Sequence, residues 1–442
     1  MGLLNWRKLE ENFGSESGYL GFLRDSPSAA QRLCHVLSNS RFLGDALNKS
    51  VESVTWLGND DSLQPRSRES LDIQTKATLE RNAGNINDFA NSIRAMRRHE
   101  IERIGLAWMS GVIDDEASLA GMTDVYDAAI EASLQWAIQH RINDIQIDEA
   151  PAAIAIIGMG RYGGREVNFS SDADVIIIYR PAEGADDDQA NLFARKVQED
   201  LRAILQGPTT FEPKIELDMD LRPEGKNGPL VRSYASCEEY YRSWASTWEH
   251  QALLRARYAA GDASLAEDFL MNIADPLRYP KIDLTETQIA EIRKLKARME
   301  AERLPRGVRR DRHLKLGKGG LSDVEWTIQL LQLQHAGDNA NLRVNGTLQA
   351  LNELEHRKLI SAGDAVVLRK AWRMCTAARN GSYLWSGRVN QADILPDDSY
   401  SLGGIAVYLG YDANRGQHFE NDLLAVIRKA RDVTERLFYG RS

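Results

Sequence analysis

The sequence predicts an α+β protein in which a short segment of mixed strands and helices lies between two helical regions. Two observations predict this class. Apolar residues recur at three- and four-residue spacing through residues 1–150 and again from about residue 280 onward, as in amphipathic helices. Between these regions, short β-rich runs alternate with helical patterns, which indicates a sheet packed against helices.

The length of 442 residues is too great for one ordinary core, so we expect more than one domain. The boundaries predicted from the change in pattern are an N-terminal helical region over 1–150, a catalytic domain over 151–275 and a C-terminal helical domain over 276–442. The apolar fraction of 43% and charged fraction of 27% are typical of a globular protein.

The composition also disfavours several classes. A net charge of −9 argues against general nucleic-acid binding, because phosphate backbones require an excess of Lys and Arg. No apolar run approaches the roughly 20 residues of a membrane span. The three cysteines are far apart and lack metal-ligand spacing, which favours buried thiols in a reducing cytoplasm.

The N-terminal region shows two clear helical patterns, over residues 27–48 and 85–113. The second pattern contains three basic residues, Arg94, Arg97 and Arg98, which we expect on a solvated helix face rather than in a phosphate or protein contact.

The segment after residue 150 changes character. Strands are predicted at 152–157, 172–179 and 214–223, with a helix over 188–206 between the second and third. A further helix is predicted over 237–260. The helices expected in the C-terminal region are 284–304, 321–336, 345–359, 362–384 and 418–438.

The run "GMGRYGGREVNFSSDADVIIIY" at 158–179 contains Gly158, Gly160 and Gly163 at the spacing of a dinucleotide-binding fingerprint. That fingerprint opens a crossover helix, and a parallel crossover needs about a dozen or more residues. Only the seven residues "GREVNFS" separate Gly163 from the next strand segment. We therefore reject a Rossmann nucleotide site, and the sequence also lacks a P-loop.

Nucleotidyl transfer explains the stretch better. Asp172 and Asp174 share one face of a strand, because a strand alternates its side chains with a period of two. Their mutual repulsion would be relieved by a hard divalent cation, which takes carboxylate, water and phosphate oxygens. In "IELDMDLRP", Glu216, Asp218 and Asp220 lie on one face of a predicted strand and offer a third ligand. The alternative for that run is an exposed acidic face of an edge strand.

The glycines then have a different purpose, because residues without Cβ atoms let backbone N–H groups approach a triphosphate. Ser170 and Ser171 are candidate phosphate donors, although turn hydroxyls commonly bond their own backbone. The candidate nucleotide-binding residues of this turn are Gly158, Gly160, Arg161, Gly163, Gly164, Ser170 and Ser171.

At this point the stretch resembles the signature of the glutamine synthetase adenylyltransferases, also called glutamate–ammonia-ligase adenylyltransferases. The resemblance continues in order and spacing through "ELDMDLRPEGKNGPLV", "TWEHQALLRAR" and "KLGKGGLSDVEWTIQLLQLQHA", and covers the chain from about residue 20. It implies a DNA-polymerase-β-like nucleotidyltransferase domain followed by a helical domain. It also implies ATP as substrate, Mg²⁺ or Mn²⁺ as the cation, and a tyrosine of glutamine synthetase as acceptor.

Carried over by motif, Asp172, Asp174 and Asp218 match the family's metal carboxylates. The family often has Arg at the position of Asp220, which leaves the choice between Asp218 and Asp220 open. Arg161 and Tyr162 stand where many members have Lys and Leu.

Other residues of the matching motifs carry more than one interpretation. Ser322 and Glu325 in "GKGGLSDVEW" form a predicted capping box at a helix start. The further nucleotide-site candidates are Asp220, Arg222, Lys315 and Lys318, and for the two lysines a solvated turn or a partner-protein contact is the alternative. In "WEHQALLRAR", we expect Arg255 and Arg257 to balance the acidic site, Trp248 and Leu254 to lie in the core, and His250 to be a packed or exposed helix residue.

In this family the full enzyme carries two units, one that transfers AMP from ATP and one that removes it by phosphorolysis. "TWEHQALLRAR" is similar to the C-terminal, adenylylating unit, since the other carries a Trp-Glu-Arg-Tyr type sequence there, and "ERLFYGRS" resembles a natural C-terminus. The resemblance implies a cytoplasmic enzyme that modifies glutamine synthetase and so lowers nitrogen assimilation. Two alternatives stay open: the deadenylylating unit, which forms ADP, and a non-catalytic module that binds glutamine synthetase or the PII signal protein.

Overall fold

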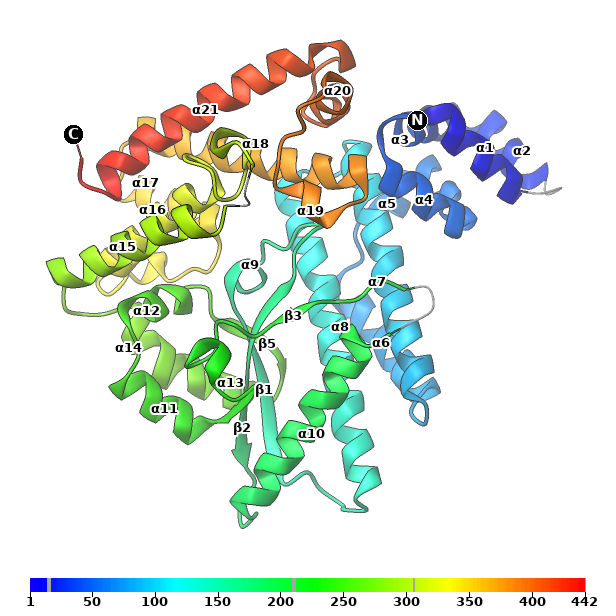
Figure 1. Cartoon of the computed structure of the whole chain (residues 1–442). Helices are drawn as coiled ribbons and strands as arrows, with labels where there is room; N and C mark the ends of the chain where they lie inside the picture. Colours follow the sequence, from blue (N-terminus) through cyan, green and yellow to red (C-terminus); the bar gives the residue numbers. More distant parts are fainter. Residues whose placement is uncertain (14–16, 209–211, 305–306, 442) are drawn as a thin grey trace.

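The computed structural model describes residues 1–13, 17–208, 212–304 and 307–441. It confirms a helix-rich α+β architecture with one mixed sheet (Figure 1). Among the described residues, no helix combines the length and apolar character needed to cross a membrane.

The first part of the chain is helical, as predicted. Its α-helices are α1 (Gly2–Phe13), α2 (Ser17–Asp25), α3 (Pro27–Asn39), α4 (Arg41–Lys49), α5 (Asp60–Leu63), α6 (Arg68–Arg81), α7 (Ile86–Met109) and α8 (Asp115–Asp144), and a 3₁₀ helix covers Val51–Gly58. The helix predicted over 27–48 is two helices. Ser40 separates them because its hydroxyl accepts the backbone N–H of Leu43 and caps α4.

The basic run of α7 is not a solvated face, and that prediction was wrong. Arg94 is fully buried and donates to the carbonyls of Ile204 and Gly207 at 2.8 and 2.9 Å. Arg97 donates to the hydroxyl of Tyr126, and Arg98 pairs with Glu212 at 2.9 Å. Arg94 and Arg98 thus tie α7 to the segment that carries the sheet, and Arg97 ties α7 to α8.

The sheet contains β1 (Ala152–Gly158), β2 (Ala173–Pro181), β3 (Leu217–Asp218), β4 (Val231–Ser233) and β5 (Arg257–Gly261). Its order is β3-β2-β1-β5, and β4 also pairs with β2. Strands β1 and β2 are antiparallel, which confirms that the glycine turn between them is not a Rossmann crossover. β3 runs parallel to β2 and places Asp218 opposite Asp174.

Helices cover both faces of the sheet, and the period of two separates the strand side chains into two cores. Ile154, Ile156, Val175 and Ile177 join a core with α8 and α10 (Asp187–Gln206), whereas alternate residues such as Ile157 and Ile176 pack with α11 (Tyr234–Ser243) and α13 (Ala263–Asp268).

The segment predicted as one helix over 237–260 forms three elements instead. α11 ends at Ser243, α12 (Thr247–Leu253) follows, and β5 begins at Arg257 after a short turn. The break is stabilised by Glu249, whose carboxylate accepts the backbone N–H of Ser246 at 2.8 Å. Strand β5 then pairs with the centre of the sheet through β1.

The rest of the chain is helical and builds a separate core. Its α-helices are α15 (Glu286–Glu302), α16 (Leu321–His335), α17 (Thr347–His356), α18 (Ala362–Ser386), α19 (Val389–Ala392), α20 (Ser399–Tyr408) and α21 (Gly416–Leu437), whereas α14 (Asp275–Arg278) packs on the sheet-side core. In the described part of the chain after α10, 3₁₀ turns also cover Gly225–Asn227, Arg310–Arg312, Ala340–Leu342 and Ala413–Arg415, and a π-helical turn covers Phe269–Ala274. Figure 1 shows α15 to α21 as a layer beyond the sheet end that carries the short helix α9 (Gly160–Gly163).

Candidate active site

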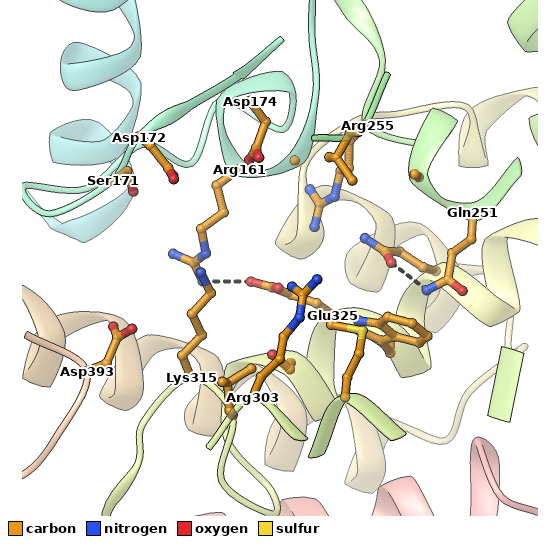
Figure 2. A pocket seen from close by; sticks show the side chains of 18 of the residues that line it. Arg161, Ser171, Asp172, Asp174, Gln251, Arg255, Arg303, Lys315, Glu325 and Asp393 are labelled. Atoms are coloured by element: carbon orange, nitrogen blue, oxygen red, sulfur yellow. Dashed lines mark hydrogen bonds and ion pairs between the residues drawn. The ribbon is translucent and has the colours of Figure 1, made fainter. Parts of the chain in front are cut away.

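A cavity of about 750 Å³ lies where the β1–β2 turn meets α12, α15, α16, α18 and α19. Its volume is within the range of small-molecule sites. Figure 2 shows Asp172 and Gln251 on opposite sides of the cavity, with Arg161 and Glu325 drawn between them. The cavity therefore takes residues from the sheet and from the C-terminal helices.

Two of the predicted carboxylates, Asp172 and Asp174, line this cavity. Asp172 is exposed at the start of β2, and Asp174 is half-buried one strand period later. Asp218 does not line the cavity but lies beside Asp174 through the β2–β3 pairing. Burial, followed by the charges of Asp172 and Asp218, raises the pKa of Asp174 to about 7.

The charges of Lys315 and Arg161 lower the pKa of Asp174, but burial and the neighbouring carboxylates outweigh them. Within the described ranges, no three His, Cys, Asp or Glu side chains form a ready-made metal cage. Two cavity carboxylates fit a Mg²⁺ ion that completes its coordination with water and substrate phosphates, which is the usual binding mode of this ion. The raised pKa of Asp174 shows that bringing the carboxylates together has a cost, which a bound cation would offset.

The third predicted strand is shorter than expected, and this separates Asp220 from the site. β3 ends at Asp218, whose Oδ1 accepts the backbone N–H of Asp220 at 2.7 Å. Asp220 itself points to Lys226, with the charged atoms 3.2 Å apart. Glu216, Asp218 and Asp220 therefore do not form one continuous strand face.

Arg222 has a structural role in the turn that follows β3. Its guanidinium is buried and donates to the carbonyls of Met219, Lys226 and Gly228. It does not line the cavity. These three carbonyls account for Arg222 without a phosphate contact.

Of the four glycines in the turn, Gly160 alone lines the cavity. It adopts a positive φ of 53°, and a Cβ atom there would lie 2.0 Å from Asp174 Oδ2. Gly163 and Gly164 instead make room for Arg255, and Gly158 ends β1. The turn therefore brings the backbone against a carboxylate.

Ser170 and Ser171 line the cavity beside the carboxylates. Both hydroxyls donate to Asn168 Oδ1, at 3.2 and 2.8 Å. The Ser171 oxygen also accepts the backbone N–H of Asn168 at 3.1 Å. Both hydroxyls therefore bond within the turn, the alternative to the predicted phosphate contact.

The wall opposite the carboxylates is cationic. Arg161 pairs with Glu325 at 2.6 Å, and Arg379 pairs with Asp393 at 2.5 Å. Figure 2 shows Lys315 between Asp393 and Glu325. Burial, followed by the charges of Arg379 and Arg161, lowers the pKa of Lys315.

Several donors on this wall are unused. Among the described residues, Arg161 Nε, Arg161 Nη1 and Arg379 Nη1 are buried without a hydrogen-bond partner. Buried N–H groups are normally hydrogen-bonded, so these atoms indicate a missing acceptor. Cationic guanidinium donors favour an anionic acceptor such as a phosphate.

Comparison with known families identifies the chain. Residues 30–272 match the family model described as glutamate-ammonia ligase adenylyltransferase, which is more than half of the chain. The chain belongs to the glutamate-ammonia ligase adenylyltransferase family. Residues 292–438, which contain most of α15 and the helices through α21, match the model described as GlnD PII-uridylyltransferase.

Curated relatives named bifunctional glutamine synthetase adenylyltransferase/adenylyl-removing enzyme match along nearly the whole chain. A protein of Bifidobacterium longum (strain DJO10A) is 79% identical over 442 residues, covering 100% of this chain and 41% of the relative. One from Leifsonia xyli is 42% identical over 439 residues, covering 99% and 42%. One from Mycobacterium tuberculosis is 41% identical over 440 residues, covering 99% and 44%. The chain thus spans about two-fifths of the length of these relatives.

Several expectations for this family member need correction. α16 begins at Leu321 with Gly320 before it, so Ser322 and Glu325 do not form the predicted capping box. Glu325 pairs with Arg161 instead. Lys318 is exposed and lies outside the cavity.

The "WEHQALLRAR" motif of this adenylyltransferase-family chain is also arranged differently from expectation. Arg255 pairs with Glu166 at 3.4 Å and Arg257 with Asp127 at 2.8 Å, so neither balances the acidic site directly. Trp248 is half-buried in the cavity rather than in the core, whereas Leu254 is fully buried as predicted. His250 is half-buried on α12, as expected.

Sequence reasoning missed several cavity residues, among them Arg379, Gln251 and Gln329. Arg379 could have been found from its spacing in the sequence. It follows Cys375 by four residues on α18, which places it on the buried face of that helix, and a buried-face arginine requires a partner. The two glutamines had no comparable signal, because they come together from α12 and α16 only in the folded chain.

Proposed function

We propose that this chain is a nucleotidyltransferase that moves AMP from ATP to a tyrosine of glutamine synthetase and releases pyrophosphate. The observation that carries the proposal is the cavity, in which the β2 carboxylates face a cationic wall with unused N–H donors. A nucleoside triphosphate with a divalent cation needs carboxylates to bind the cation and cationic donors to bind the phosphates. Membership of the adenylyltransferase family and the names of the relatives support the same reaction.

Asp172, Asp174 and Asp218 would hold Mg²⁺ or Mn²⁺, with Asp174 and Asp218 on neighbouring strands. The cation would supply charge stabilisation for the phosphates. Asp218, which already accepts a backbone N–H, is also our candidate to receive the phenol proton. The tyrosine oxygen then bonds to the α-phosphorus as the bond from that phosphorus to the β-phosphate oxygen breaks.

Arg161, Lys315 and Arg379 would bind the phosphates on the opposite side of the cavity. The buried donors of the two arginines lack partners among the described residues, so a phosphate would satisfy them. Gly160 would let the turn backbone approach, with Ser170 and Ser171 beside it. These residues position the triphosphate and neutralise charge, which is most of what phosphoryl transfer requires.

We also propose the finer architecture. Residues 151–275 would form a DNA-polymerase-β-like nucleotidyltransferase domain between the helical region 1–150 and the helical domain 276–442. In support, β2 and β3 carry the carboxylates, and the loop before α16 together with α18 brings the cations to them. The PII signal protein is a further proposed partner, supported by the PII-uridylyltransferase match over 292–438.

The relatives' name covers a second activity, removal of the adenylyl group, and this is the competing assignment. We propose the adenylylating direction from the resemblance of "TWEHQALLRAR" to that unit. The reaction centre alone does not select a direction, because microscopic reversibility requires one geometry for AMP moving either way.

Radiolabelled ATP with Mg²⁺ and unmodified glutamine synthetase tests the direction. We expect label on glutamine synthetase and a matching increase in its intact mass. We expect little ADP from the modified protein and inorganic phosphate. Rapid phosphate-dependent ADP release without labelling would instead assign the chain to deadenylylation, and calorimetry without metal-dependent ATP binding would favour the non-catalytic module.

A further inference from the structure

At the end of the cavity between α12, α15 and α16, large apolar side chains line the wall, and α15 also contributes the charged residues Arg298, Glu302 and Arg303. Trp248 on α12, Leu295 and Met299 on α15, and Trp326 on α16 line it and are each only half-buried. α12 contacts both α15 and α16, so the three helices surround this end. Uncovered aromatic and apolar side chains inside a small-molecule cavity favour a flat apolar ligand group.

An amide pair borders this apolar end. Gln251 Nε2 donates to Gln329 Oε1 at 2.8 Å, and each glutamine follows a cavity tryptophan by three residues on its helix. Gln251 is only 3% exposed, whereas Gln329 is half-buried. Figure 2 shows Gln251 and this hydrogen bond on the side of the cavity opposite Asp172.

The hydrogen bond fixes which atoms of Gln329 remain available. Its Oε1 accepts from Gln251 and keeps one lone pair, and its Nε2 has no hydrogen bond to any residue in the described part of the chain. If both side-chain amides were turned over, Gln251 Nε2 would occupy the position where Gln251 Oε1 now lies buried without a partner. Two N–H donors would then be buried without acceptors instead of one oxygen without a donor. Gln329 therefore presents an acceptor and a donor side by side.

We propose that this end of the cavity is the nucleobase subsite and that Gln329 recognises adenine. The proposal rests on the function proposed above, which supplies a nucleoside triphosphate. Gln329 Oε1 accepts from the 6-amino group and its Nε2 donates to the adjacent ring nitrogen, while the tryptophans contact the base. Guanine has an acceptor in place of the 6-amino group, so it opposes Gln329 Oε1 with a second acceptor. Gln251 is a positioning residue that sets this polarity.

Calorimetric titration of the full chain with ATP and with GTP, in Mg²⁺ and without glutamine synthetase, tests the subsite. We expect the parent to bind ATP at least about tenfold more tightly than GTP. Gln329→Leu should weaken ATP binding by about tenfold and leave GTP binding nearly unchanged. Gln349→Leu is the matched control, because Gln349 is exposed on α17 outside the cavity, and it should keep the parent ratio.

Gln251→Glu tests the positioning role independently. A carboxylate cannot donate to Gln329 Oε1, so Gln329 would turn its Nε2 toward residue 251. Its Nε2 would then face the 6-position of the base and its Oε1 the adjacent ring nitrogen, which matches guanine rather than adenine. The ATP-to-GTP preference should then fall or reverse, which a purely structural role would not cause. An unchanged preference in Gln329→Leu, or a parent without preference, would overturn the subsite. Selective ATP binding without AMP transfer would instead overturn the proposed function and leave the subsite standing.

Discussion

Asp172 and Asp174 are the residues on which the proposed chemistry depends most directly. Asp172→Asn and Asp174→Asn should each nearly abolish AMP transfer, since the amide keeps the side-chain volume and loses the metal-binding charge. Asp218→Asn should behave in the same way. The measurement is the rate of label incorporation into glutamine synthetase, with thermal unfolding to show that the fold is retained.

Asp220 provides the matched control for this series. It contacts Lys226 and lies outside the cavity, so Asp220→Asn should change the rate by no more than a few-fold. If Asp220→Asn were inactive and Asp218→Asn active, the third carboxylate would be wrongly assigned.

The raised pKa of Asp174 leads to a second prediction, which concerns the pH dependence of stability. Burial and the neighbouring carboxylates raise this pKa from 3.8 to about 7 in the folded chain, so the folded state binds the proton more tightly than the unfolded state. The free energy of unfolding of the metal-free protein should therefore fall as the pH rises from about 4 through 7. The total decrease from this group is about 1.4 kcal/mol for each unit by which the folded pKa exceeds the unfolded pKa.

Asp174→Asn removes this titration and keeps a neutral side chain. In metal-free buffer it should raise the melting temperature relative to the parent more at pH 8 than at pH 5. An equal change at both pH values would show that Asp174 has an ordinary pKa in the folded protein.

At the scale of elements, the β1–β2 turn positions Asp174. Gly160→Ala would place a Cβ atom 2.0 Å from Asp174 Oδ2 at a φ of 53°. We expect about a hundredfold loss of transfer rate, because small displacements of reacting groups have effects of that size. Gly184→Ala is the control, since Gly184 also has a positive φ, of 77°, but open space around it. The control should lose stability by about 1–2 kcal/mol and retain its rate.

The helices and strands also show where a local sequence pattern was enough to predict an element and its bounds. Apolar periodicity predicted α10 to within one residue, because that helix buries one continuous face. The same reasoning joined α11, α12 and β5 into one helix. Arg257 to Gly261 form a strand because β1 provides a hydrogen-bonding edge, and an edge contributed by distant residues leaves no local periodic signal.

At the scale of the whole molecule, the Arg161–Glu325 pair connects the sheet segment to α16 across the cavity. Both side chains are largely buried, at 10% and 14% exposure. Glu325→Ala should destabilise the chain by about 3–5 kcal/mol, because it leaves an uncompensated buried cation. The double variant Arg161→Met with Glu325→Leu should be less destabilised. Urea unfolding of the parent, single and double variants measures both effects.

An exposed ion pair provides the control for these unfolding measurements. Lys196 and Glu199 lie 2.8 Å apart with side chains 46% and 52% exposed, so Glu199→Ala should cost less than about 1 kcal/mol. A loss as small as this in Glu325→Ala would show that the cavity pair does not hold the two parts of the molecule together.

The sequence by itself determined the α+β class and the rejection of a Rossmann turn, and it singled out Asp172 and Asp174 as the candidate metal carboxylates. Each follows from spacing within a few residues, where the period of a strand or the length of a connection decides the geometry. The tertiary structure alone decided that Arg161 contacts Glu325, 164 residues away, and that Gln251 contacts Gln329, 78 residues away. Such contacts depend on how separate cores pack together, and the local pattern of either residue carries no information about the position of the other.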